Sequence, residues 1–336
     1  MALHAVENVE EAFDVTREFL TPIDVRRWLR LALVVFFVES GVSFPTAQLN
    51  ASSPPGDVSN GDLPFSLQVD AVTLVVVLVV AGLLFGTLFA LIGAIMEFVL
   101  IESLRTGEVS LRRHWRRRWR QGLRLFGFRI AIALPMLASF AGWFALLAIP
   151  LFIGRDPAIP LATFLVGIPV VFIVSVLYAL VSSFTTVFVV PLMVQADSGV
   201  LAAWRRLWGS IKTAWKQYLA YVVIAFLLTI AAGIIASIAV GTIAIVLLVP
   251  VLVVAAITHV TVSLWSTVGI VVSVALALLF GLATLAVWTL AQVPVVTYLR
   301  YYALLVLGDI EVSFDVLSDR GPSVTPVSDE PSPGES

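Results

Sequence analysis

The chain has 336 residues, of which 60% are hydrophobic and 12% are charged, and its formal net charge is −2 at pH 7. Soluble domains are about half apolar and about a quarter charged, so an ordinary water-soluble fold is excluded. The sequence has no cysteine, which also excludes disulfides, thiol catalysis and thiolate metal sites. We therefore expect an all-α, polytopic helical membrane protein with about six transmembrane helices and additional interfacial amphipathic helices.

An amphipathic helix is predicted over residues 5–20, within a cytoplasmic or interfacial segment, 1–27, that includes the start of span one. Its apolar side chains share one helical face, with acidic residues on the other: Val6, Val9, Phe13 and either Phe19 or Leu20. The acidic start lacks the basic region of a secretory signal, so we expect the first hydrophobic segment to stay in the membrane.

Span one is predicted from the helix-start signal of Thr21 as N-cap, Pro22 in the first turn and Asp24. It enters the membrane over residues 29–44 and ends before Pro45. Residues 46–69 have the Pro, Ser, Gly, Asn and Asp composition of a solvated loop.

The transmembrane helical domain is predicted over residues 28–307. Its further spans cover about 70–102, 126–152, 160–194, 218–250 and 265–299. Residues 217–299 contain no Asp, Glu, Lys or Arg and could hold four short crossings, which gives eight spans as the alternative. We prefer two, because no polar turn divides this stretch.

Charge predicts the orientation. With an amino terminus inside the cell, 19 of the 20 Lys and Arg residues lie on the cytoplasmic side or at its boundary, and only Arg155 lies outside. The prediction is a multi-pass protein of the cell membrane with both termini in the cytoplasm. Residues 308–336 are acidic and rich in Ser and Pro, and are expected to form a disordered cytoplasmic tail.

The two cytoplasmic connections resemble each other. Residues 115–119 (WRRRW) align with 204–208 (WRRLW) at an offset of 89, and Glu108 aligns with Asp197. Spans two and three are therefore read as a duplicate of spans four and five, a kind of repeat common in membrane proteins.

Each connection is predicted to form a helix along the inner leaflet, with indoles at the interface and arginines, Arg118 among them, on the remaining surface. The candidate lipid-interface residues are Trp115, Arg116, Arg117, Trp119, Trp204, Arg205, Arg206 and Trp208. They indicate either recognition of anionic lipid headgroups, or docking of a partner, or simply topology and anchoring. Binding of nucleic acid is disfavoured, because the membrane-seeking tryptophans fix these arginines against the bilayer.

Three ionisable residues are predicted inside the membrane. Glu39 lies about 13 Å along the helix from Arg30, near the midplane, and indicates either a proton or cation pathway or a hydrogen-bonded contact between helices. Glu97 and Arg129 lie at similar depths in neighbouring spans and are expected to form a structural ion pair. Glu102 is expected to contact Arg105 or Arg124.

Signals for a catalytic or metal site are missing. The histidines, His4, His114 and His259, have no ligand-spaced partner in the sequence, and no phosphate loop or nucleophile elbow occurs. We expect no catalytic residue, no metal and no cofactor.

Residues 5–14, 28–32 and 293–309 resemble a family of uncharacterised membrane proteins from halophilic archaea, and this similarity covers nearly the whole chain up to the tail. Residues 191–208 are also loosely similar to membrane domains associated with glycerophosphodiester phosphodiesterases, although the chain contains no hydrolase domain. A halophile setting implies a Debye length of about 3 Å, so direct contacts would have to replace long-range attraction to lipid.

The leading hypothesis for function is a non-enzymatic membrane scaffold or organising component, with the lipid bilayer and a membrane protein or second copy as partners. The rival is a small-solute or ion transporter that uses Glu39, and an enzyme comes third.

Overall fold

The computed structural model describes residues 4–21, 24–42, 71–153, 158–262 and 266–316, and every regular element in these ranges is helical, which confirms the predicted all-α class. The helices are α1 (His4–Leu20), α2 (Val25–Val42), α3 (Ala71–Thr106), α4 (Leu111–Ile153), α5 (Ala158–Phe184), the π-helix η1 (Thr185–Val189), α6 (Val190–Ala196), α7 (Val200–Val262), α8 (Thr267–Ile310) and the 3₁₀-helix η2 (Val312–Phe314).

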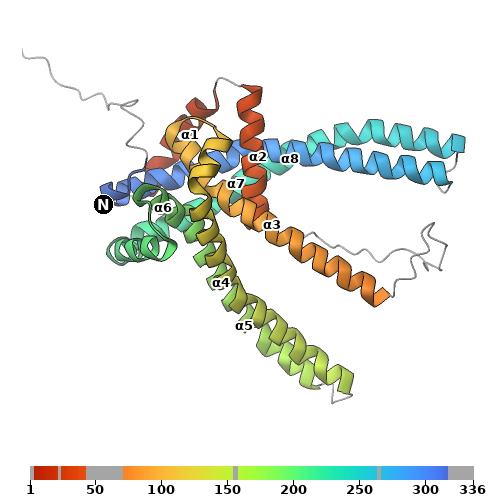
Figure 1. Cartoon of the computed structure of the whole chain (residues 1–336), viewed down its shortest axis with the longest axis horizontal. Helices are drawn as coiled ribbons and strands as arrows, with labels where there is room; N and C mark the ends of the chain where they lie inside the picture. Colours follow the sequence, from red (N-terminus) through yellow and green to blue (C-terminus); the bar gives the residue numbers. More distant parts are fainter. Residues whose placement is uncertain (1–3, 22–23, 43–70, 154–157, 263–265, 317–336) are drawn as a thin grey trace, which may run out of the picture.

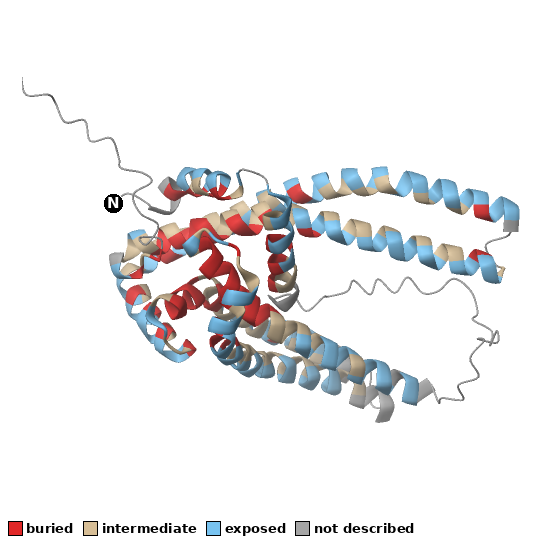
Figure 2. Cartoon of the chain, turned by 45° about the horizontal axis from the view of Figure 1, so that its top comes forward, coloured by how far each residue is buried: buried red, intermediate tan, exposed pale blue. Residues whose placement is uncertain are grey.

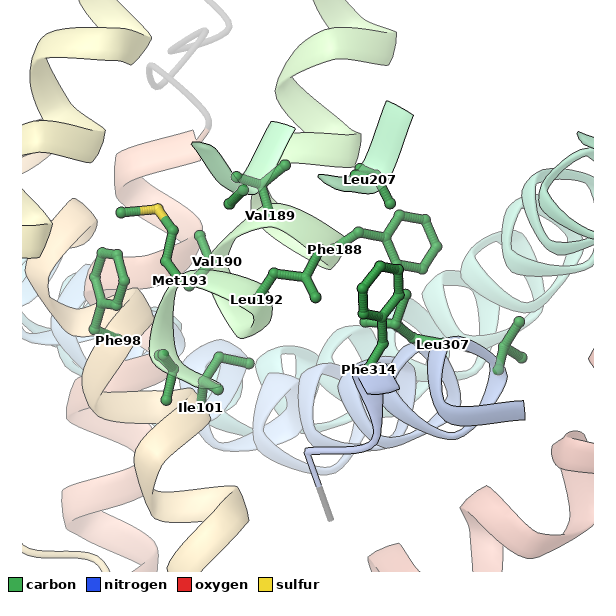
Figure 3. Packing of buried hydrophobic residues seen from close by; sticks show 14 of the residues in the cluster. Phe98, Ile101, Phe188, Val189, Val190, Leu192, Met193, Leu207, Leu307 and Phe314 are labelled. Atoms are coloured by element: carbon green, nitrogen blue, oxygen red, sulfur yellow. The ribbon is translucent and has the colours of Figure 1, made fainter. Parts of the chain in front are cut away.

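The long helices diverge from a common core as separate arms (Figure 1). One arm is the pair α7 and α8, another is the pair α4 and α5, and α3 runs between them. Buried residues gather where the helices converge, whereas the arms are mostly exposed (Figure 2). Apolar side chains from α3, η1, α6, α7, α8 and η2 fill the core, with Phe98, Phe188 and Phe314 among them (Figure 3).

Five helices are long and apolar enough to cross a membrane, and at most 6% of the best window of each is buried within the chain. They correspond to predicted spans two to six, and α7 and α8 divide the charge-free stretch into two crossings, as preferred over four. The predicted span one corresponds to α2, which has 18 residues and is not among the five. The structure therefore supports five spans directly, and the sixth stays a prediction.

The first basic connecting segment is not a helix separate from the span that follows it, which corrects the predicted arrangement, whereas the second is a helix set off from its span by a kink. Residues 111–125 are the first turns of α4, and residues 200–216 are the first turns of α7. At 1.5 Å per residue, the 43 residues of α4 are about 65 Å long, far more than the ~30 Å hydrocarbon core. Helix α7 consists of two helices joined at Ala214, whose φ of −120° and ψ of 31° are not helical.

The cap of α2 lies three residues later in the chain than predicted. Asp24, not Thr21, caps the helix: the Asp24 Oδ1 atom accepts from the backbone N–H of Arg26 at 3.0 Å, and its carbonyl accepts from Trp28 at 2.9 Å. Thr21 instead ends α1, because its N–H and hydroxyl both donate to the carbonyl of Arg17. Pro22 and Pro45 lie outside the described residues.

Helix α1 packs against the last turns of α8, and its buried face agrees with the predicted one in part. Phe19 is buried and Val9 packs against the core, as expected, whereas Phe13 is 60% exposed and the additional buried residues are Asn8 and Ala12. The Asn8 amide donates to the Asp309 carboxylate at 2.7 Å. Burial, and then the charge of Asp309, raise the pKa of Glu11 above its usual value. The two ends of the described chain therefore lie together at the core.

The folded part extends past the predicted tail boundary at residue 308. Helix α8 continues to Ile310, and Phe314 and Val316 are each 3% exposed. The Gln195 amide also donates to the carbonyl of Asp315 at 3.1 Å. Apolar side chains in an otherwise acidic segment explain this docking, and residues 317–336 of the predicted tail lie outside the described residues.

Candidate functional site

A buried carboxylate with two arginines lies where the arms converge. The side chain of Glu97 on α3 is completely buried, and its Oε2 atom lies 3.6 Å from Nη2 of Arg129 on α4. This confirms the predicted pair. A second partner was not predicted: Nη2 of Arg300 on α8 pairs with Oε1 of Glu97. Arg300 is one of the 19 basic residues that the sequence predicts on the cytoplasmic side or at its boundary, and the charge pattern does not indicate this contact.

The π-helix η1 completes this cluster. A π turn shifts the backbone hydrogen bonds by one residue, which leaves a carbonyl available to other donors. The Thr186 carbonyl accepts from Nη1 of Arg300 at 2.9 Å, and its hydroxyl oxygen accepts from Nη2 of Arg129 at 2.8 Å. Two guanidinium groups are therefore bound by one carboxylate and one threonine.

The offset of the predicted internal repeat relates two members of this cluster, because Thr186 lies 89 positions after Glu97. Helices α4 and α7 also begin 89 residues apart, at Leu111 and Val200. Just before them, Gly107 and Asp197 have positive φ values of 73° and 47°. The starts of α4 and α7 thus have the spacing of the predicted duplication, and Glu97 and Thr186, which are one offset apart, contact the same pair of arginines. The duplication itself stays a prediction.

Glu39 lies on α2 beside a cavity of about 350 Å³ between α2, α5, α7 and α8. The cavity also reaches Arg300 and the Tyr221 ring, but apolar side chains make up most of its lining. Glu39 forms no hydrogen bond or ion pair with any other described residue. The carboxyl group is therefore neither sealed in the core nor on a continuous polar path.

A second polar network ties the two repeats together, and it centres on Arg118. Its side chain is 4% exposed, which corrects its predicted place on the helix surface. Its Nη2 atom donates to Glu102 at 2.9 Å, and its Nη1 atom donates to Gln121 at 3.0 Å and to Asp197 at 3.3 Å. The Gln121 amide donates to Asp197 at 2.7 Å. This set, the Arg118 network, is buried except for the exposed side chain of Asp197, and it joins α3 and α4 to the end of α6.

The partners of the Glu102 carboxylate differ from the predicted ones, which were Arg105 or Arg124. Besides Arg118, its other close cation is Arg117, at 3.6 Å, whose side chain is largely exposed. The partners therefore come from the first turns of α4, because these turns fold back against the end of α3.

The tryptophans of the two basic segments divide into equivalent classes. Trp115 and Trp204, which are repeat equivalents, are half-buried against the core, and Trp204 donates to the Thr185 hydroxyl at 3.1 Å. Trp119 and Trp208, also equivalents, are 47% and 54% exposed. Arg116, Arg117, Arg205 and Arg206 are exposed beside them. In each basic segment, therefore, one indole belongs to the fold and the other is free to meet lipid.

Among the residues that the structure describes, no group of three or more His, Cys, Asp or Glu side chains could hold a metal ion. His114 lies between two hydroxyls instead, with Nδ1 at 3.5 Å from Ser103 and Nε2 at 3.3 Å from Ser110.

Long apolar helices, ionisable groups neutralised within the helix bundle and basic turns at one end define a multi-pass helical membrane protein. The chain belongs to a family of unknown function, DUF7544, whose model matches residues 3–317. No curated protein matches the chain. No solved structure matches it either.

Proposed function

We propose that the protein is a non-enzymatic membrane scaffold, which inserts diverging apolar arms into the bilayer and holds a basic surface against the headgroups of its cytoplasmic leaflet. The observation that carries this proposal is the exposure of the arms. At most 6% of each best apolar window is buried by the rest of the chain, so lipid or another membrane protein must cover it.

The twin basic segments support the lipid contact. Each presents one exposed indole beside exposed arginines, and the two copies lie at the same end of the molecule as the packed core. Indoles prefer the membrane interface, and guanidinium groups bind phosphate oxygens directly. In this proposal both termini face the cytoplasm, and the anionic headgroups and membrane partners are the ligands.

The tryptophans are expected to anchor the protein more strongly than the arginines. Replacing Trp119 and Trp208 with Ala removes two interfacial indoles. For each replacement we expect the free energy of unfolding in lipid nanodiscs at molar salt to fall by about 2 kcal/mol. The matched control, Arg116→Gln with Arg205→Gln, should lose less stability, because salt already screens the arginine charges that it removes. Thermal unfolding in nanodiscs compares the two variants. A larger loss for the arginine pair would show that electrostatics is the main anchor.

The rival function is transport through Glu39, and it is supported by the cavity that this carboxyl group lines. The mostly apolar lining favours the scaffold, because an ion pathway needs polar groups along its length. Proton, cation and solute flux into liposomes distinguishes the two functions. We expect the wild-type protein and the Glu39→Gln variant to match empty liposomes. Flux that the wild type supports and Glu39→Gln abolishes would establish transport instead.

A further inference from the structure

An open cavity of about 710 Å³ lies where the start of α4 meets α2, at the basic end of the molecule. Its lining contains four arginines and no carboxylate: Arg30, Ser110, Leu111, Arg112, Arg113 and Arg116. We call it the arginine cavity. Its walls are fixed to each other, because Nη1 of Arg30 donates to the Val109 carbonyl and Nη2 of Arg27 donates to the Gly107 carbonyl, each at 3.3 Å.

The positive charge of the arginine cavity is poorly compensated. Arg112 and Arg116 are four residues apart on α4 and so project from the same side of the helix. Neither side chain forms an ion pair or hydrogen bond with another described residue. Arg113 lies 4.0 Å from Glu108, but both side chains are about three-quarters exposed, so water screens this pair. An anion in the cavity would relieve the repulsion between the four cations.

The backbone adds donors to this cavity. The first N–H groups of a helix have no partner within the helix, and they attract anions. Ser110 precedes α4, but its hydroxyl lies 3.3 Å from Nε2 of His114. In the described part of the chain no side chain accepts from the N–H of Arg112 or Arg113. The cavity therefore combines guanidinium groups with free backbone donors.

We propose that the arginine cavity binds a phosphate group, either on a lipid headgroup or free in solution. A guanidinium group binds two phosphate oxygens at once, and four of them around one cavity provide more donors than one phosphate can use. The inference deepens the proposed scaffold function and rests on it only for the lipid source, because a headgroup reaches the cavity only if this end of the protein lies at the membrane surface.

The test uses the full chain in phosphatidylcholine nanodiscs, titrated separately with inorganic phosphate and with dihexanoyl phosphatidic acid, in a calorimeter. The cavity variant is Arg112→Gln with Arg116→Gln. The matched control is Arg205→Gln with Arg206→Gln, which removes the same charge from the exposed start of α7, outside the cavity. We expect at least tenfold weaker binding for the cavity variant and less than a twofold change for the control.

Each outcome has a defined meaning. Tighter binding of phosphatidic acid assigns the cavity to a lipid headgroup, and equal or tighter binding of inorganic phosphate assigns it to free phosphate. Equal losses in both variants, or no binding by the wild type, would overturn the proposal. A further variant, Arg112→Lys with Arg116→Lys, keeps the positive charge. Its affinity for phosphate should fall several-fold, because a lysine ammonium group cannot bind two phosphate oxygens as a guanidinium group does. Phosphate titration does not measure transport, so flux through Glu39 would refute the scaffold while leaving this result intact.

Discussion

Replacing Glu97 with Ala is expected to lower the free energy of unfolding by about 3–5 kcal/mol, because it leaves Arg129 and Arg300 buried without their shared carboxylate. Both guanidinium groups would keep only Thr186 as a polar partner in this cluster. Glu97→Gln should lower the free energy of unfolding by less, since the amide oxygen still accepts a hydrogen bond although the negative charge is gone.

The control for this experiment is Glu108→Ala, which removes a carboxylate from an exposed pair with Arg113. Such pairs contribute about 1 kcal/mol or less, so the control should unfold almost as the wild type does. Unfolding by a denaturing detergent, followed by circular dichroism, measures both variants. Similar small losses for Glu97→Ala and Glu108→Ala would show that the buried cluster does not hold the arms together.

Replacing Arg118 with Ala is expected to have an effect of similar size, about 3–5 kcal/mol, because the change leaves the buried Glu102 carboxylate with only the exposed Arg117 nearby. Gln121 and Asp197 also lose the cation that joins the two repeats. Arg118→Leu should not restore stability, although the equivalent residue of the second repeat is Leu207, because leucine cannot satisfy Glu102.

Arg120→Ala is the matched control for Arg118. Arg120 is exposed on the same helix, and its guanidinium carbon lies 5.6 Å from the centre of the Trp119 ring. An exposed contact of this kind contributes about 0.5–1 kcal/mol. The same detergent titration compares the two alanine variants. If Arg118→Ala unfolds no more easily than Arg120→Ala, the Arg118 network contributes little to the joining of the repeats.

Hydropathy and charge predicted most of the architecture, because bilayer thickness and exclusion of charge act on each helix separately. The same depth argument predicted the Glu97 and Arg129 pair. It did not predict the contact of Arg300 with Glu97, since a lone arginine after a long apolar stretch indicates only the membrane boundary. Only the packing of α8 against η1 brings this residue to Glu97, and sequence spacing does not encode that contact.

Arg118 shows a different limit of the sequence. Its neighbours in the motif are exposed arginines, so charge alone assigned it to the surface. A signal was nevertheless present, because the 89-residue offset aligns Arg118 with the apolar Leu207, and both residues are buried. The offset also aligns Glu97 with Thr186. A position-by-position alignment of the two halves of the repeat would therefore have indicated the burial of Arg118 and the place of Thr186 beside Glu97.

The central claim is that lipid hydrocarbon surrounds the diverging arms, and single spin labels test it most directly. The chain has no cysteine, so one label can be attached at Leu146, Ile235 or Leu282, each on an arm and more than half exposed, with a label at Leu201 near the basic end for comparison. In liposomes we expect the arm labels to collide readily with oxygen and rarely with a water-soluble nickel chelate. Frequent nickel collisions at the arm positions would place them in water and contradict the account.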